Sequence, residues 1–383
     1  MISRAELLKR IEKHFQVNRI VCLLGPRQCG KTTIARELFT KSGKDRQDPG
    51  YFDLEKPSDT LALTTPDLVL PQIRGLVVID EVQRKPDLFP YLRYLHDEKS
   101  DQKFLILGSA SRDLINQSSE SLAGRISFLE ITPFSINEIS DWQNLWLKGG
   151  FPRSFLLESE ESMLWREGYM RTYIEQDLGT FGLNFQRDIL QKLWFMLAHY
   201  HGQIMNYSEF ASSLGVSQPT IKRYISYLTG GFMLRMINPW HENIQKRQVK
   251  SPKVYYRDSG LLFYVLGISR YQDIFRHPKS GFAFEGFCME EIIRHSGVPD
   301  DSCYFWRSYN QAELDLLILK NGKKYGFEIK LSDAPKITPS MKNVVTELGL
   351  TQLTVVYPGS RKFQLSEEIE ALPVGRLSEF EFK

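Results

Sequence analysis

Short apolar runs alternate with stretches of helical spacing along the first third of the chain. The runs are four to six residues long and rich in β-branched side chains, as buried strands are. Apolar positions recur at helical spacing over 31–39 and 87–97, with Pro86 near the start of the second helix, where its missing N–H does little harm. The expected strands are residues 19–24, 50–53, 76–80, 104–107 and 126–129. This order of strands and helices predicts an α/β domain with a parallel sheet.

Helical patterns dominate the middle of the chain. Aromatic residues such as Trp142, Trp146 and Trp165 recur among charges at helical intervals, and the turn Gly149-Gly-Phe-Pro152 interrupts them. Residues 187–237 are again helical but more compact. We therefore expect a helical connector over 141–186 and a small helical domain over 187–250.

The last third of the chain mixes both patterns. The dipeptide Asn321-Gly322 lies between two apolar runs and is typical of a tight hairpin turn. Helices are expected at 284–295 and 338–347, and strands at 304–308, 314–320, 325–330 and 352–357. Residues 251–383 are therefore expected to form a small mixed α/β domain.

Composition narrows the class of protein. Of the 383 residues, 42% are hydrophobic and 25% are charged, which argues against disordered, collagen-like and disulfide-rich proteins. No apolar run approaches the ~20 residues of a membrane helix, and the first 15 residues do not resemble a signal peptide. The cysteines Cys22, Cys29, Cys288 and Cys303 lack CxxC spacing, which suits a reducing compartment and excludes a cysteine-rich zinc site. We expect a cytoplasmic protein with no membrane partner.

The strongest chemical signal lies between the first strand and the first helix. Residues 25–32, Gly-Pro-Arg-Gln-Cys-Gly-Lys-Thr, match the phosphate-binding pattern GxxxxGK[ST]. Glycines let backbone N–H groups wrap the phosphates, Lys31 neutralises the β and γ charges, and the Thr32 hydroxyl binds Mg²⁺ at the helix N-terminus. The residues expected to bind ATP are Gly25, Pro26, Arg27, Gln28, Cys29, Gly30, Lys31, Thr32 and Thr33.

Two later strands end in residues that such a site needs. The strand at 76–80 ends in Asp80 and is followed by Glu81. Asp80 is expected to hold Mg²⁺, and Glu81 to orient or deprotonate the attacking water. The strand at 104–107 runs into Gly108-Ser109-Ala110-Ser111, where Ser109 is the candidate γ-phosphate sensor and a plain turn is the alternative.

Many such ATPases complete the charge neutralisation with an arginine, often from a neighbouring subunit. Arg125, which precedes an apolar strand, is the first candidate, and Arg112 and Arg153 are alternatives. A surface or salt-bridge role stays open for each of them. We therefore expect a homo-oligomer with the arginine supplied in trans.

Residues 207–228 follow the pattern of a helix-turn-helix. The turn is expected at Gly215-Val-Ser217, with Ser217 as N-cap of the second helix. The side chains expected to pack inward are Phe210, Ala211, Leu214, Ile221, Ile225 and Leu228. The side chains left to meet DNA are Gln218, Thr220, Lys222 and Arg223, and the β-prone residues 232–237 predict a wing. A protein-docking module or a spacer is the alternative, because the net charge of +3 identifies no nucleic-acid partner.

Carboxylates in the last domain follow the order of a PD-(D/E)xK nuclease. Glu285 lies in the expected helix, Asp315 in one strand of the hairpin and Glu328-Ile-Lys330 in the other. In such a fold the three carboxylates gather around Mg²⁺, while Lys330 positions the attacking water. Leu314 replaces the nominal proline before Asp315. The alternative is a fold that only binds DNA or partners, with nearby Glu313 as an exposed edge charge.

Together these motifs resemble the AAA+ ATPases of prokaryotes that carry an uncharacterised C-terminal region, the archaeal ATPase-like group. The resemblance covers nearly the whole chain. It rests on 25–32, Asp80-Glu81, 108–111, 120–125 and 132–135, and continues through 149–152, 173–177 and 253–261. It implies an AAA+ fold and a restriction-endonuclease-like C-terminal region. Gln176 stands where this family tends to have arginine, so the role of that arginine is not carried over.

The sequence therefore predicts four parts. They are an α/β P-loop AAA+ ATPase domain over 1–140, a helical connector over 141–186, a winged helix over 187–250 and a nuclease-like domain over 251–383. The expected function is Mg·ATP binding and hydrolysis coupled to DNA binding or remodelling. Two alternatives stay open: an ATP-regulated, metal-dependent DNA nuclease, and a non-enzymatic nucleotide switch that binds DNA or protein.

Overall fold

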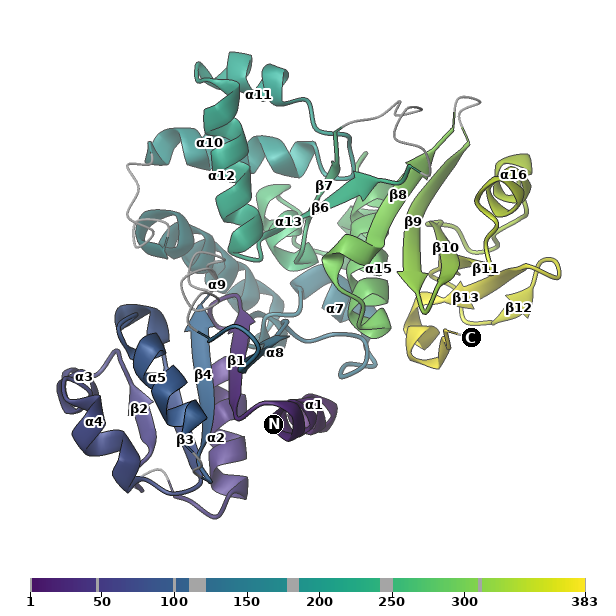
Figure 1. Cartoon of the computed structure of the whole chain (residues 1–383). Coiled ribbons are helices and arrows are strands. Elements are labelled where there is room, and N and C mark those ends of the chain that lie inside the picture. Colours follow the sequence, from purple (N-terminus) through teal and green to yellow (C-terminus); the bar gives the residue numbers. More distant parts are fainter. Residues whose placement is uncertain are drawn as a thin grey trace. The chain divides into compact units, whose positions relative to one another are not determined.

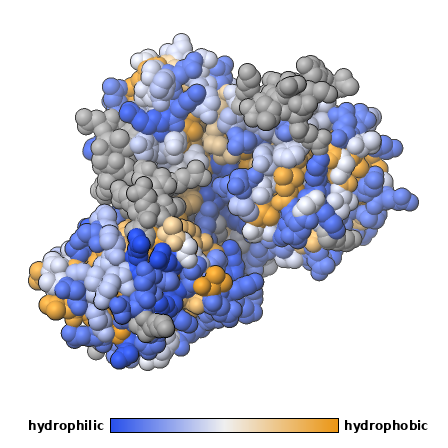
Figure 2. Space-filling view, viewed as in Figure 1, coloured by the Kyte–Doolittle hydropathy of each residue, from blue (hydrophilic) through white to orange (hydrophobic). Residues whose placement is uncertain are grey.

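The computed structural model describes residues 2–45, 48–98, 101–109, 122–177, 186–241, 251–308 and 312–382 (Figure 1). The chain divides into two compact units. The N-terminal unit comprises residues 1–133 and 230–232, and the C-terminal unit comprises 134–229 and 233–383. The surface in view is mostly hydrophilic, with small apolar patches (Figure 2). Within the described ranges, no helix has the length and apolar character to span a membrane.

A five-stranded parallel sheet forms the core of the N-terminal unit. Its strand order is β2-β3-β4-β1-β5. The strands are β1 (Ile20–Gly25), β2 (Tyr51–Asp53), β3 (Leu76–Asp80), β4 (Lys103–Ser109) and β5 (Ile126–Glu130). The predicted parallel α/β sheet is confirmed. Because β1 and β3 flank β4, the carboxyl ends of these three strands lie next to one another.

Alternate residues of the central strands point to opposite faces of the sheet, and each face is covered by different helices. Val21 and Leu23 of β1 pack in one apolar cluster with α1 (Ala5–Val17) and α2 (Lys31–Lys41). Cys22 packs in the other cluster with α5 (Leu88–Asp97). Short helices α3 (Pro57–Ala62) and α4 (Pro66–Val69) connect β2 to β3. Helix α1 was not among the expected helices, although its buried residues follow helical spacing.

The C-terminal unit begins with helices. They are α7 (Trp142–Lys148), α8 (Pro152–Leu156), α9 (Ser159–Thr172) with a π-helical turn at Tyr173–Asp177, α10 (Arg187–His199), α11 (Tyr207–Leu214) and α12 (Gln218–Gly230). Gly215 ends α11 in the left-handed conformation (φ 65°), which a glycine adopts without steric cost. The Ser217 hydroxyl accepts a hydrogen bond from the Thr220 N–H (3.3 Å), as an N-cap does. A helix, a turn and a second helix therefore occur where the sequence pattern predicts them.

An eight-stranded mixed sheet follows, in the order β12-β13-β11-β10-β9-β8-β6-β7. Its strands are β6 (Leu234–Pro239), β7 (Lys253–Tyr256), β8 (Cys303–Arg307), β9 (Glu313–Lys320), β10 (Lys323–Ile329), β11 (Gln352–Tyr357), β12 (Phe363–Gln364) and β13 (Ile369–Pro373). Asn321 (φ 53°) and Gly322 (φ 76°) form the tight turn between β9 and β10. The segment predicted as a wing, residues 232–237, contains most of β6, which pairs with β7 and with β8 and so joins this sheet.

The remaining helices of the C-terminal unit are α13 (Ser259–Val265), α14 (Tyr271–Ile274), α15 (Ser280–Ser296) and α16 (Pro339–Leu348). Most of α15 is buried. Helix α16 packs Met341, Val344 and Leu348 against apolar residues of β9 and β11. Glu285 therefore lies inside a helix that is enclosed by the rest of this unit.

Candidate functional site

The loop between β1 and α2 is sharply folded. A side chain at Gly25 would place its Cβ 2.1 Å from the Ile131 carbonyl oxygen, so only glycine fits there. Gln28 (φ 60°) and Gly30 (φ 101°) both adopt left-handed conformations. Lys31 then begins α2, whose first N–H groups have no partner within the helix. A folded loop ahead of a helix N-terminus is the geometry that binds phosphate.

The Lys31 ammonium lies over this loop. Its Nζ donates hydrogen bonds to the carbonyl oxygens of Gly25 and Pro26, each at 2.9 Å. The residue is 6% exposed. Neutral carbonyls are weaker partners for an ammonium than an anionic phosphate oxygen is, so this side chain is free to exchange its acceptors for a phosphate.

Thr32 and Asp80 meet at the carboxyl ends of the strands. The Thr32 hydroxyl donates to Asp80 Oδ2 at 2.8 Å, and the Tyr51 hydroxyl donates to the same oxygen at 3.2 Å. Burial raises the pKa of the Asp80 carboxyl above its ordinary value, while the hydrogen bond from Thr32 opposes that rise. Tyr51 was not predicted from the sequence, because it reaches Asp80 only through the pairing of β2 with β3.

Glu81 follows Asp80 in a left-handed conformation (φ 55°), which is uncommon for a residue other than glycine. Its Oε2 accepts hydrogen bonds from Gln83 and from the Ser109 hydroxyl, the latter at 3.2 Å. Gln83 Nε2 also donates to Ser109 Oγ at 2.8 Å. Glu81, Gln83 and Ser109 therefore form a hydrogen-bonded group across the ends of β3 and β4. Gln83 was not predicted from the sequence.

Arg4 supports the loop from the side of α1. Its guanidinium donates to the Cys29 carbonyl (3.1 Å) and to the Thr132 carbonyl (2.9 Å), and the residue is 8% exposed. These bonds tie the phosphate-binding loop to the segment after β5. This role of Arg4 was not predicted, because its partners are 25 and 128 residues away in the chain.

Three comparisons with known proteins bear on this site. Residues 17–140 match the family model of an AAA domain. The chain is 42% identical over 381 residues to the uncharacterized proteins Rv2008c of Mycobacterium tuberculosis and Mb2031c of Mycobacterium bovis, covering 98% of this chain and 85% of each of theirs. This chain belongs to the same family as these mycobacterial proteins, and its residues 17–140 form an AAA domain.

Two further family models match the part of the chain that follows the AAA domain. Residues 139–272 and 280–377 match two domains of unknown function, DUF8612 and DUF4143. The solved structure of the Walker-type ATPase PABY2304 of Pyrococcus abyssi is similar, with a TM-score of 0.50 and 12% identity, over 70% of this chain and 96% of that one. At that identity the likeness concerns the fold.

Arg125 of the ATPase lies far from its own phosphate-binding loop. It precedes β5, whose first residue Ile126 pairs with Ile20 at the start of β1, whereas the loop follows the end of β1. The guanidinium forms a two-pronged ion pair with Asp97 (2.7 and 3.1 Å). Of the two other candidate arginines, Arg153 is an exposed residue of α8, and Arg112 lies outside the described residues. Ala110 and Ser111, which follow Ser109, also lie outside the described residues.

The four candidate DNA-contact residues lie near the start of α12. Gln218, Lys222 and Arg223 are exposed, whereas Thr220 is half-buried and its hydroxyl is hydrogen-bonded to Ser217 (2.9 Å). The Lys222 ammonium lies 5.3 Å from the centre of the Tyr207 ring. Of the residues predicted to pack inward, all are buried except Leu214, which is partly exposed.

The carboxylates predicted for a nuclease site lie near one another in the C-terminal unit, among basic and hydroxyl partners. Lys330 Nζ contacts Glu328 Oε1 at 2.5 Å, and Asp315 Oδ2 accepts from the Ile329 N–H at 2.8 Å. Burial and the neighbouring Asp315 charge raise the pKa of Glu285 to about 7 and that of Glu328 to about 8. Over the parts of the chain that the structure describes, no three His, Cys, Asp or Glu side chains are grouped as a metal site requires.

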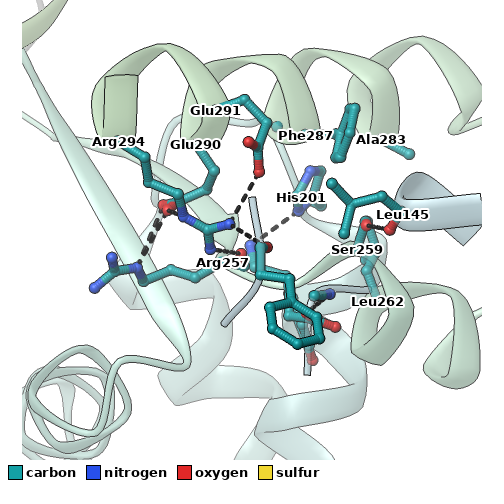
Figure 3. A pocket seen from close by; sticks show the side chains of 15 residues that line it. Leu145, His201, Arg257, Ser259, Leu262, Ala283, Phe287, Glu290, Glu291 and Arg294 are labelled. Carbon is teal, nitrogen blue, oxygen red and sulfur yellow. Dashed lines mark hydrogen bonds and ion pairs between the residues drawn. The ribbon is translucent and has the colours of Figure 1, made fainter. Parts of the chain in front are cut away.

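A second, largely buried charged cluster lies along α15 (Figure 3). Glu290 is paired with the arginines Arg235, Arg257 and Arg294, and Glu291 Oε2 accepts from the Ile136 N–H at 2.7 Å. Burial alone would raise the pKa of Glu290, but its three arginine neighbours outweigh that effect and hold it at about 2. The adjoining cavity of about 10 Å³ has space for roughly one water molecule. The ion pairs of this cluster therefore stabilise the C-terminal unit. The cavity beside them is too small to admit a nucleotide.

Two motifs noted in the sequence meet beside this cluster. The Asp258 carboxylate accepts hydrogen bonds from the Gly150 N–H (2.8 Å) and, as N-cap of α13, from the Leu261 N–H (2.9 Å). A side chain at Gly149 would come within 2.1 Å of this carboxylate. The glycine pair and Asp258 are therefore explained by packing within the C-terminal unit.

Proposed function

We propose that the ATPase binds Mg·ATP at the loop between β1 and α2, hydrolyses it, and couples the hydrolysis to the binding or remodelling of DNA. The observation that carries the proposal is the meeting of Thr32 with Asp80, at 2.8 Å, beside Glu81 at the end of the same strand. This arrangement sets a hydroxyl, a carboxylate and a second carboxylate at one helix N-terminus. P-loop NTPases use such a hydroxyl and carboxylate to hold Mg²⁺ and a further polar side chain to position the attacking water.

The residues present fit a magnesium ion. Mg²⁺ prefers oxygen ligands and is usually bound by one or two protein oxygens together with phosphate. Thr32 Oγ1 and Asp80 Oδ2 already lie within hydrogen-bonding distance of each other, so both can face one ion. When bound, the ion would neutralise charge on the phosphates.

The side chains of the ATPase would divide the remaining tasks. Lys31 would leave the carbonyls of its own loop and bind the phosphate tail, while the backbone of 25–33 encloses it. Glu81 would orient the attacking water and accept its proton. Ser109, which is hydrogen-bonded to Glu81 at 3.2 Å, would report the presence of the γ-phosphate.

We propose that the second helix of the pair α11 and α12 contacts DNA, as part of a winged helix completed by β6 and β7. Gln218, Lys222 and Arg223 support this proposal because they are exposed on one helix near its N-terminus. Arginine, lysine and glutamine are the side chains that most often contact phosphates and base edges. A homo-oligomer with Arg125 supplied in trans is part of the same proposal, because Arg125 cannot reach its own loop.

The proposal is tested by measuring ATP turnover of the full-length protein with and without single-stranded, duplex and branched DNA. The same reactions are then examined for cleaved DNA strands. We expect turnover that DNA stimulates while the strands stay intact. Glu81→Gln should bind ATP yet lose about 100-fold or more in turnover. Lys222→Ala with Arg223→Ala should lose the stimulation but keep the basal rate, with the exposed pair Lys9→Ala and Arg10→Ala as a control.

Other outcomes would favour the alternatives. Cut strands that depend on Asp315 would favour a nuclease. ATP binding without any turnover would favour a nucleotide-dependent switch.

A further inference from the structure

Carboxylates gather around one buried lysine in the C-terminal unit. The lysine is Lys253, the first residue of β7, and its side chain is 6% exposed. Its charge interacts with Glu285 on α15 and with Glu313 and Asp315 on β9, and Glu328 on β10 interacts in turn with Asp315 and Glu285. We call these five residues the acidic cluster.

The Lys253 ammonium is positioned by direct contacts from several elements. Its Nζ lies 2.6 Å from Glu313 Oε1 and 3.5 Å from Glu285 Oε1. It also lies 5.4 Å from the centre of the Phe305 ring on β8, a distance at which the ring face attracts a cation. The strands β7, β8 and β9 and the helix α15 thus all contribute to holding one positive charge.

Carboxylate oxygens of the cluster also have hydrogen-bond or ion-pair partners other than Lys253. Glu285 Oε1 accepts a hydrogen bond from the Tyr255 hydroxyl at 2.5 Å, and Asp315 Oδ2 accepts from the Ile329 N–H at 2.8 Å. Glu328 Oε1 is paired with Lys330 Nζ at 2.5 Å. A divalent ion needs several free oxygens at about 2.0–2.6 Å. The partners of Glu285 Oε1, Asp315 Oδ2 and Glu328 Oε1 compete with a metal ion for these three oxygens.

We propose that the Lys253 ammonium is the resident cation of the acidic cluster and that the cluster binds no divalent metal. The observation behind this proposal is the contact of the Lys253 ammonium with both Glu313 and Glu285, and the proposal is independent of ATP binding at the other unit. An ammonium offers charge and hydrogen bonds but cannot act as a Lewis acid or lower the pKa of a bound water as a metal does. The cluster is therefore expected to stabilise β7, β9 and α15 and to perform no metal-dependent cleavage of DNA.

The experiment is a titration of nucleotide-free, full-length protein with Mn²⁺, followed by electron paramagnetic resonance of the free ion. The wild-type protein and Asp315→Asn are expected to bind the same amount of Mn²⁺, since the cluster contributes no site. Lys253→Met removes the charge at similar length and is expected to gain one bound Mn²⁺ per chain. Lys253→Met with Asp315→Asn should lose that ion, and Lys253→Arg, which keeps the charge, should gain none.

Two results would overturn the proposal. One is a Mn²⁺ ion bound by the wild-type protein that Asp315→Asn abolishes. The other is a folded Lys253→Met variant that gains no ion. If Lys253→Met fails to fold, the comparison of the wild type with Asp315→Asn still decides the question, because it does not need that variant. Mn²⁺ ions bound elsewhere, for example by Asp80, are bound equally by the wild type and by Asp315→Asn, so they do not affect the difference between the two proteins.

Discussion

The Thr32 hydroxyl lies 2.8 Å from Asp80 Oδ2, although the two residues are 48 positions apart in the chain. The contact joins the first turn of α2 to the end of β3. It depends on both strands β1 and β3 ending at the same edge of a parallel sheet. In the proposed function, these two oxygens face the magnesium ion that accompanies ATP.

Thr32→Ala removes the hydroxyl and leaves Asp80 buried without that donor. The hydroxyl is also one of the two oxygens that would face the magnesium ion, and if its loss costs as much as a hydrogen bond to a charged group, ~1.5–3 kcal/mol, the affinity for Mg·ATP falls about 10- to 100-fold. Thr32→Ser keeps the hydroxyl and should retain most of the affinity. Thr40→Ala, on the exposed side of the same helix, is the control. Equal affinity of Thr32→Ala and Thr40→Ala would show that the hydroxyl takes no part.

Gln83 is expected to position Glu81 for catalysis. Its amide bonds both Glu81 Oε2 and Ser109 Oγ, so Gln83→Ala frees the carboxylate to rotate. We expect kcat to fall about tenfold, while the affinity for ATP changes less than about twofold, because loss of positioning acts on the reacting state. Gln72→Ala, on the exposed surface of the same unit, should leave both quantities unchanged. A loss confined to KM would contradict the assignment.

Arg4 is expected to keep the phosphate-binding loop in shape. Arg4→Ala leaves the Cys29 and Thr132 carbonyls without these donors. We expect affinity for ATP to fall by about tenfold, since two charge-assisted hydrogen bonds are lost. Arg10→Ala, which removes the same charge from the exposed face of α1, should bind ATP as the wild type does. Equilibrium titration with a fluorescent ATP analogue measures the affinity of each variant.

His201 makes the C-terminal unit sensitive to acid. Its Nδ1 accepts from the Tyr256 N–H (3.0 Å), its Nε2 lies 3.1 Å from the Phe282 carbonyl oxygen, and burial lowers its pKa to about 3. Between pH 6.5 and 3 the unfolded chain binds a proton there that the folded chain does not. The contribution of His201 to the free energy of unfolding is therefore present above pH 6.5 and is lost as the pH falls towards 3.

His201→Gln should consequently lower stability at pH 7 yet flatten its decline between pH 7 and pH 5. All six tryptophans lie between residues 142 and 306, within the C-terminal unit. Urea unfolding followed by tryptophan fluorescence therefore reports on this unit alone. His199→Gln, at an exposed position, is the control. An equally steep decline in His201→Gln and the wild type would rule out this role.

The parallel sheet could be predicted because its signals are local. Each strand of the N-terminal unit is a short apolar run, and the loop at 25–32 is a contiguous motif between a strand and a helix. The elements that position Lys31, Thr32 and Asp80 follow from these signals alone. Helix α1 was missed because its charges obscured the apolar positions Leu7 and Ile11, which pack on the sheet.

Partners that depend on long-range packing could not be predicted. Tyr51 reaches Asp80, and Gln83 reaches Ser109, only because of strand order and register. Arg4 reaches the loop only because α1 packs on the sheet, and nothing in its local sequence marks it. Lys253 is a lysine in an apolar strand, and its position among carboxylates requires four elements to come together.

The most direct test of the account is equilibrium binding of ATP to the full-length protein in the presence of Mg²⁺, comparing wild type with Lys31→Ala. Lys41→Ala, at the end of the same helix and paired with Glu37 at the surface, is the matched control. We predict saturable binding by the wild type and by Lys41→Ala, and a loss of about tenfold or more in Lys31→Ala. Absence of ATP binding by the wild type, or equal affinity of all three proteins, would contradict the account.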